Sequence, residues 1–112
     1  MATIKSYTDI EQSKKLAEIL PLESADMSWV SNGFGKPFAR TIPIKGDPEE
    51  LCGCWSLAAL LGVLPDYTLQ TNTDGTVFVV CESKKPMISD AYDNPVDACV
   101  AMIERLHELN LL

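Results

Sequence analysis

The sequence predicts an α+β fold in which about three helices pack on a small antiparallel sheet. Two segments carry capping residues and place their apolar side chains at helical spacing, and residues 67–82 read as a β-hairpin. The chain has no strand–helix–strand unit with a phosphate-binding turn, which argues against a doubly wound nucleotide-binding fold. At 112 residues it has the size of one domain, so we expect residues 1–112 to form a single α+β domain.

The first helix is expected from about Asp9 to Leu20. Residues 8–11, Thr-Asp-Ile-Glu, match a capping box, in which a hydroxyl and a carboxylate satisfy free backbone N–H groups. Pro21 then stops the helix. The apolar residues between these limits share one half of the helical surface, so the helix is predicted to be amphipathic.

Two short strands are expected next, at Met27–Val30 and at Phe38–Ile44. The stretch between them, "SNGFGKP", contains two glycines and a proline and is predicted to be a loop. Pro43 has no N–H to donate, so the second segment is expected at a sheet edge or as an irregular strand.

The most apolar part of the chain predicts a central helix. Residues 47–50, Asp-Pro-Glu-Glu, form a typical helix start. Gly53 is expected to break or kink this helix, so its main part should run from about Cys54 to Val63 and end before Pro65. Apolar side chains spread around much of this helix place it in the core.

The hairpin of residues 67–82 is the clearest local signal, because Asp74-Gly75 is a dipeptide that two-residue type I′ turns prefer. Pairing outward from that turn gives the expected core face: Thr73 with Thr76, Thr71 with Phe78, and Leu69 with Val80. The opposite face would then hold Val77, Val79 and Cys81. Either another element covers that face or it is a partner surface, and we favour a cover.

The last helix is expected to begin after Asn94, which can cap it, with Pro95 at the first position and Asp97 near the positive end of the helix dipole. One side of this helix is charged and the remainder is apolar, so the helix should face the core.

The charge balance argues against nucleic-acid binding. The chain carries 16 acidic and 9 basic residues, a net charge of −7, and its adjacent basic pairs, Lys14-Lys15 and Lys84-Lys85, are too small to form a phosphate-binding stripe. No apolar run approaches the roughly 18 residues of a membrane span, and no signal sequence is apparent. We therefore expect an acidic cytoplasmic protein with four reduced thiols and no contact with membranes.

Cys54-Trp55 resembles the nucleophile pattern of the papain-like cysteine proteases. One residue is missing between Gly53 and Cys54, however, and the chain is about half the length that such a protease needs. His107, the sole histidine, lies near the end of the last helix and not on a strand, and is expected to be half-buried there. No catalytic residue is therefore predicted, and a thiol-dependent enzyme using Cys54 with His107 is kept as an alternative.

Zinc is a weaker alternative. Cys52 and Cys54 could supply two ligands, with Cys81, Cys99 or His107 completing the set, but the spacing is not that of paired zinc knuckles. Cys81 and Cys99 lie in apolar contexts, where cysteine behaves as a small hydrophobic residue. No metal site and no cofactor are predicted.

Three blocks suggest a family: residues 15–27 ("KLAEILPLESADM"), 54–61 ("CWSLAALL") and 93–112 ("DNPVDACVAMIERLHELNLL"). Together they resemble a group of small uncharacterised proteins from gut Bacteroidetes and their phages or mobile elements. That resemblance implies an accessory protein and supplies no functional residue. The hairpin followed by a helix starting with proline is also similar to the HicB-type antitoxin module, an analogy at the level of the fold alone.

We therefore predict a small noncatalytic protein-interaction or accessory module, which the resemblance associates with phages or mobile elements. The hairpin and the glycine-rich loop are where apolar side chains are not explained as helix core, and these parts supply the predicted contact residues: Trp29, Phe34, Phe38, Val77 and Val79. The partner is expected to be a protein, and the sequence names neither that partner nor an oligomeric state.

Overall fold

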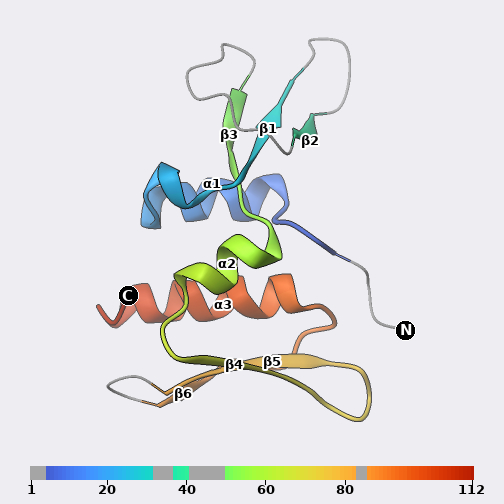
Figure 1. Ribbon diagram of the computed structural model, residues 1–112, viewed down its shortest axis with the longest axis vertical. Coiled ribbons are helices and arrows are strands. Elements are labelled where there is room, and N and C mark those ends of the chain that lie inside the picture. Colours follow the sequence, from blue (N-terminus) through green and yellow to red (C-terminus); the bar gives the residue numbers. More distant parts are fainter. Residues whose placement is uncertain (1–4, 32–36, 41–49, 83–85) are drawn as a thin grey trace.

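The computed structural model describes residues 5–31, 37–40, 50–82 and 86–112 and confirms the predicted α+β class (Figure 1). Three α-helices lie between two small antiparallel sheets instead of covering one sheet. At one end of the molecule is the sheet β2-β1-β3 and at the other is β4-β5-β6. In chain order the elements are α1 (Ile10–Ile19), a one-turn 3-10 helix (Leu22–Ser24), β1 (Met27–Val30), β2 (Phe38–Arg40), β3 (Glu50–Cys54), α2 (Leu57–Val63), β4 (Tyr67–Thr71), β5 (Val77–Cys81), β6 (Met87–Ile88) and α3 (Pro95–Glu108).

Helix α1 has the predicted extent but a cap one residue later than expected. Asp9 is the N-cap, and its carboxylate accepts the backbone N–H of Gln12 while the Gln12 side chain accepts the N–H of Asp9. The capping box is therefore Asp9 with Gln12, and not Thr8 with Glu11. Thr8 is fully buried instead, and its hydroxyl lies 2.7 Å from that of Ser13 and accepts the backbone N–H of Trp55.

The predicted central helix is shorter than expected, because its first part is a strand. Residues 50–54 form β3, which pairs with β1 and places Met27 opposite Cys54. Ser56 then caps α2, accepting the N–H of Ala59 at 3.2 Å. Cys54 thus lies at the end of a strand and not at a helix N-terminus. Of the helix start predicted at residues 47–50, residues 47–49 fall outside the described residues, and Glu50 begins β3 instead of a helix.

The hairpin is present, but its register and core face are corrected. Gly75 donates to the carbonyl of Asn72 at 3.0 Å and has a φ of +90°, and Asn72 donates to the carbonyl of Thr76 at 2.8 Å. The loop therefore has three residues, with glycine in the left-handed position, and not two. This extra residue shifts the pairing by one, to Thr71 with Val77, Leu69 with Val79, and Tyr67 with Cys81.

Helix α3 begins as predicted, with Asn94 accepting the N–H of Asp97 and Pro95 in the first turn. It contacts β5 on one side and both α1 and α2 on others, so it joins the two ends of the molecule. The core around it contains side chains from the three helices, from β5 and β6, and from connecting segments, among them Leu16, Trp55, Leu60, Val79, Cys99 and Ile103. No helix in the described part of the chain combines the length and apolar character needed to cross a membrane.

Candidate functional site

Trp29 lies in the middle strand of the sheet β2-β1-β3, opposite Ala39 on one side and Cys52 on the other. Its neighbours in β1 are buried, whereas its own side chain is only partly so. The indole N–H donates to the carbonyl of Thr8 at 3.1 Å, and the ring meets Tyr7 edge-on, with centroids 5.9 Å apart and planes at 69°. The segment before α1 therefore holds this tryptophan in one orientation at the surface.

Two hollows flank Trp29. One, of about 420 Å³, is mainly apolar; the other, of about 360 Å³, opens toward Lys5, Ser6 and Tyr7. Asp9 lines both of them. Together these hollows form what we call the Trp29 surface, whose described residues are Lys5, Ser6, Tyr7, Asp9, Ile10, Glu11, Trp29 and Pro37.

Of the predicted contact residues, Trp29 lies at the centre of this surface. Phe38 is 47% exposed, but it pairs with Val30 and so lies on the opposite face of the sheet. Phe34 falls outside the described residues. The sequence did not single out Tyr7, Ile10 and Pro37, because these residues lie apart from Trp29 in the chain and only the tertiary fold brings them next to it.

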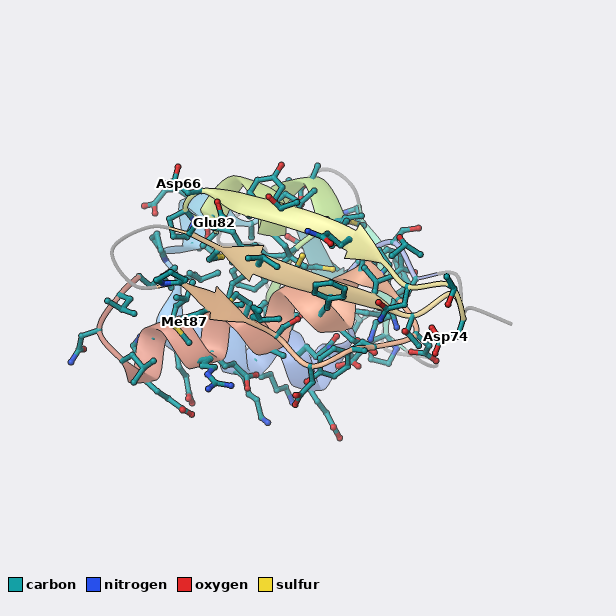
Figure 2. The ribbon with its side chains drawn as sticks, turned by 90° about the horizontal axis from the view of Figure 1, so that it is seen from below. Asp66, Asp74, Glu82 and Met87 are labelled. Carbon is teal, nitrogen blue, oxygen red and sulfur yellow. The ribbon has the colours of Figure 1, made fainter. Side chains whose placement is uncertain are left out.

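Val77 and Val79 do not lie on an exposed surface. Both are buried on the face of β5 that packs on α3, so α3 supplies the cover that the sequence favours for this face. The outward face instead carries Phe78 and Val80, with Ile88, which pairs with Val80, 62% exposed beside them. Figure 2 shows this sheet from the side opposite α3, with acidic residues at its ends: Asp66 and Glu82 at one and Asp74 at the other.

The Cys54 thiol has surroundings unlike those of a nucleophile. Its side chain has no exposed surface, and its sulfur lies 3.5 Å from the carbonyl oxygen and 3.8 Å from the hydroxyl of Thr8. Burial raises the pKa of the Cys54 thiol to about 11, although hydrogen bonds from Thr8 and Ser13 act in the opposite direction. The neutral thiol, which is a poor nucleophile, is therefore the form present near neutral pH.

His107 is exposed in the last turn of α3 and not half-buried, so the predicted position of this side chain is corrected. No hydrogen bond joins it to Cys54 among the described residues. Nor do the described residues contain any group of three or more histidine, cysteine, aspartate or glutamate side chains placed to hold a metal ion. Cys81 and Cys99 are fully buried, and burial raises the pKa of the Cys99 thiol to about 12.

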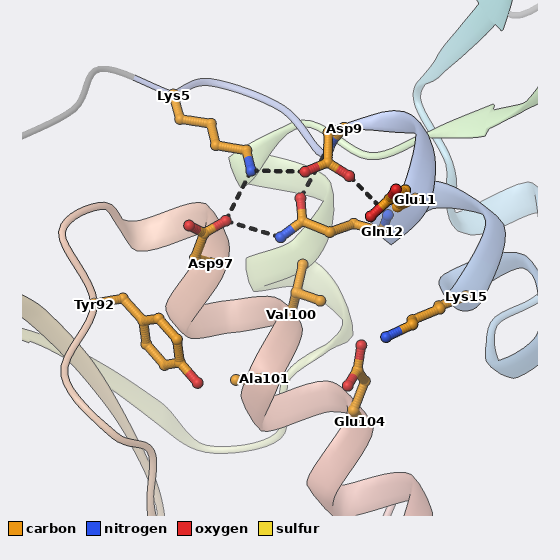
Figure 3. A pocket seen from close by; sticks show the side chains of 10 residues that line it. All are labelled: Lys5, Asp9, Glu11, Gln12, Lys15, Tyr92, Asp97, Val100, Ala101 and Glu104. Atoms are coloured by element: carbon orange, nitrogen blue, oxygen red, sulfur yellow. Dashed lines mark hydrogen bonds and ion pairs between the residues drawn. The ribbon is translucent and has the colours of Figure 1, made fainter.

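A polar hollow of about 370 Å³ lies between α1 and α3 (Figure 3). At its edge the Lys5 ammonium is 2.8 Å from Asp97 and 3.3 Å from Asp9, and the Gln12 amide donates to the same Asp97 oxygen at 2.8 Å. Desolvation alone would raise the pKa of Asp97, but hydrogen bonds from Lys5, Asn94 and Gln12 outweigh it and hold that pKa below its ordinary value. The single positive charge of Lys5 is shared by the carboxylates of Asp9 and Asp97, and Gln12 joins α1 to Asp97 on α3, so we interpret this cluster as a link between helices.

No protein-family model matches the chain, and comparisons with curated proteins and with solved structures gave no significant match. The resemblances to proteins of gut Bacteroidetes and to antitoxin modules therefore stay predictions.

Proposed function

We propose that this chain is a noncatalytic interaction module that binds a partner protein through the Trp29 surface. The observation that carries the proposal is the partly exposed Trp29 ring, held in place by Thr8 and Tyr7 beside a mainly apolar hollow of about 420 Å³. Tryptophan and tyrosine contribute large contact areas at little cost in conformational entropy and dominate many protein interfaces. An aromatic pair of this kind on the surface favours binding over a purely structural role.

The alternative of a thiol-dependent enzyme has weaker support. A catalytic cysteine needs an accessible thiolate and a base within hydrogen-bonding reach. Cys54 is buried with a raised pKa, and its described hydrogen-bond partners are Thr8 and Ser13, not His107. The antitoxin-type alternative depends on the resemblance alone, and no contact described above favours it.

A random peptide library displayed on phage tests the proposal without a known partner. The full chain serves as bait, and the recovered peptides are then measured against Trp29→Leu and Ile10→Gln. We expect peptides whose affinity falls by at least about tenfold for Trp29→Leu, as is usual for a central interface tryptophan. Ile10→Gln, which changes the hollow but not the strand, should weaken the same peptides.

Tyr67→Ser is the matched control, because Tyr67 is an aromatic residue with 42% exposure on β4, in the other sheet. It should leave peptide binding unchanged. Thermal unfolding of each variant shows whether the fold is retained. Recovery of no specific peptide, or of peptides that bind both hollow variants as tightly as the wild type, would contradict the proposed function.

A further inference from the structure

We infer that the apolar hollow beside Trp29 receives an arginine side chain from a basic segment of the partner protein. This inference rests on the proposed function and specifies the chemistry of its partner. The hollow is lined by Asp9, Ile10, Glu11, Trp29 and Pro37, which combine an aromatic ring, two aliphatic surfaces and two carboxylates.

Among the described residues, the ionisable side chains that line this hollow are all acidic. They are Asp9 and Glu11, and both are exposed. Glu11 forms no ion pair with any described residue, whereas Asp9 shares Lys5 with Asp97. Lys5 lines the neighbouring hollow, and Lys5 and Lys15 line the polar hollow between α1 and α3 that Glu11 also borders. No described cation lines the apolar hollow beside Trp29.

The apolar lining selects the kind of cation. Arginine can lay its aliphatic stem on Ile10 and Pro37 and stack its planar guanidinium on the indole ring of Trp29. The same group can then donate two parallel hydrogen bonds to the Glu11 carboxylate. A lysine ammonium is a more strongly hydrated point charge and cannot stack in this way. The net charge of −7 on the whole chain also favours the approach of a basic segment.

The N-terminus of α1 lies at the same place and presents a positive dipole end, which opposes a cation. Here two carboxylates already compensate the positive end of the dipole. Asp9 accepts the backbone N–H of Gln12 at 2.8 Å, and Glu11 lies in the first turn of the helix. Because the Glu11 carboxylate forms no ion pair with a described residue, it can still bind the arginine of the partner.

The test uses the ¹⁵N-labelled full chain and a capped pentapeptide of four glycines around a central arginine. The readout is the indole N–H resonance of Trp29, identified with Trp29→Phe, and the resonance of the fully buried Trp55 is an internal reference. We expect a saturable shift at Trp29. Replacing arginine with citrulline, which has nearly the same shape without the charge, should weaken binding by roughly threefold or more.

Glu11→Gln should weaken the arginine peptide by about two- to fivefold, and added salt should act in the same direction. Glu18→Gln removes the same charge from an exposed position later in α1 and should change nothing. Absence of a saturable shift, or equal binding of the citrulline or lysine peptide, would overturn the inference. Library peptides that require Trp29 but lack arginine would overturn it while supporting the proposed function, so the two failures are distinguishable.

Discussion

The Cys54 sulfur lies at the end of β3, enclosed by Thr8 and Ser13 and without exposed surface. The sequence pattern Cys-Trp before an apolar helix suggests a thiolate stabilised by a helix dipole. That reasoning fails because Ser56, two residues later, is the true helix cap, and the strand before it removes Cys54 from the dipole. The result is a thiol whose pKa is raised to about 11 instead of lowered.

The raised pKa of Cys54 predicts that iodoacetamide alkylates this thiol slowly in the native protein. With a pKa of about 11, only about 1% of Cys54 is thiolate at pH 9, and burial further hinders the reagent. In the native protein we expect Cys52, which is partly exposed, to be modified first, while Cys54, Cys81 and Cys99 react only on unfolding. Peptide mass mapping of samples with and without denaturant checks the order. Rapid native labelling of Cys54 would support the enzyme alternative.

At the scale of elements, the cap of α3 was predicted correctly, whereas the caps of α1 and α2 and the register of the hairpin were not. Asn94 with Pro95 specifies the start of α3 through local hydrogen bonding, so sequence reasoning finds it. Asp74-Gly75 is compatible with a hairpin loop of two residues and with one of three, so the sequence does not specify the loop length. The loop length sets whether Val77 or Phe78 lies opposite Thr71 and therefore which residues of the two strands share the core face. The Trp29 surface was predictable only at Trp29 itself, since its other members come from separate segments.

Replacing either of two glycines with alanine should change the free energy of unfolding, in opposite directions at Gly75 and Gly62. Gly75 has a φ of +90°, which an alanine adopts only with strain, so Gly75→Ala should lower the free energy of unfolding by about 1 kcal/mol. Gly62 lies in α2, and a Cβ atom there would meet nothing within 4 Å. Gly62→Ala should therefore raise the free energy of unfolding by roughly 0.5 kcal/mol. Urea titration of both variants checks the pair, and a stabilised Gly75→Ala would show that the three-residue loop is not formed.

At the scale of the whole molecule, α1 and α3 connect the sheet that holds Trp29 to the sheet that holds the hairpin (Figure 1). Asp97 lies at this junction and accepts hydrogen bonds from Lys5 and Gln12, which precede and begin α1. Because the pKa of Asp97 is lowered on folding, its contribution to stability is present above the unfolded pKa of about 4 and is lost as pH falls through the folded pKa. Burial alone would lower the pKa of Lys5, but the ion pairs with Asp97 and Asp9 outweigh that effect and leave the pKa raised. The contribution of Lys5 to folding stability is therefore lost only as pH rises through this raised pKa, in strong alkali.

Asp97→Asn should therefore lower the free energy of unfolding at pH 7, by about 1 kcal/mol or less because solvent reaches and screens the ion pair. The difference from the wild type should shrink as pH falls below about 4, since the wild-type carboxyl is then also neutral. Asp90→Asn is the control, because it removes the same charge from an exposed side chain that has no described ion pair. Urea unfolding at a series of pH values measures all three proteins. A loss of stability in Asp97→Asn that stayed constant down to about pH 2 would assign the effect to altered packing and not to the charge that joins the two helices.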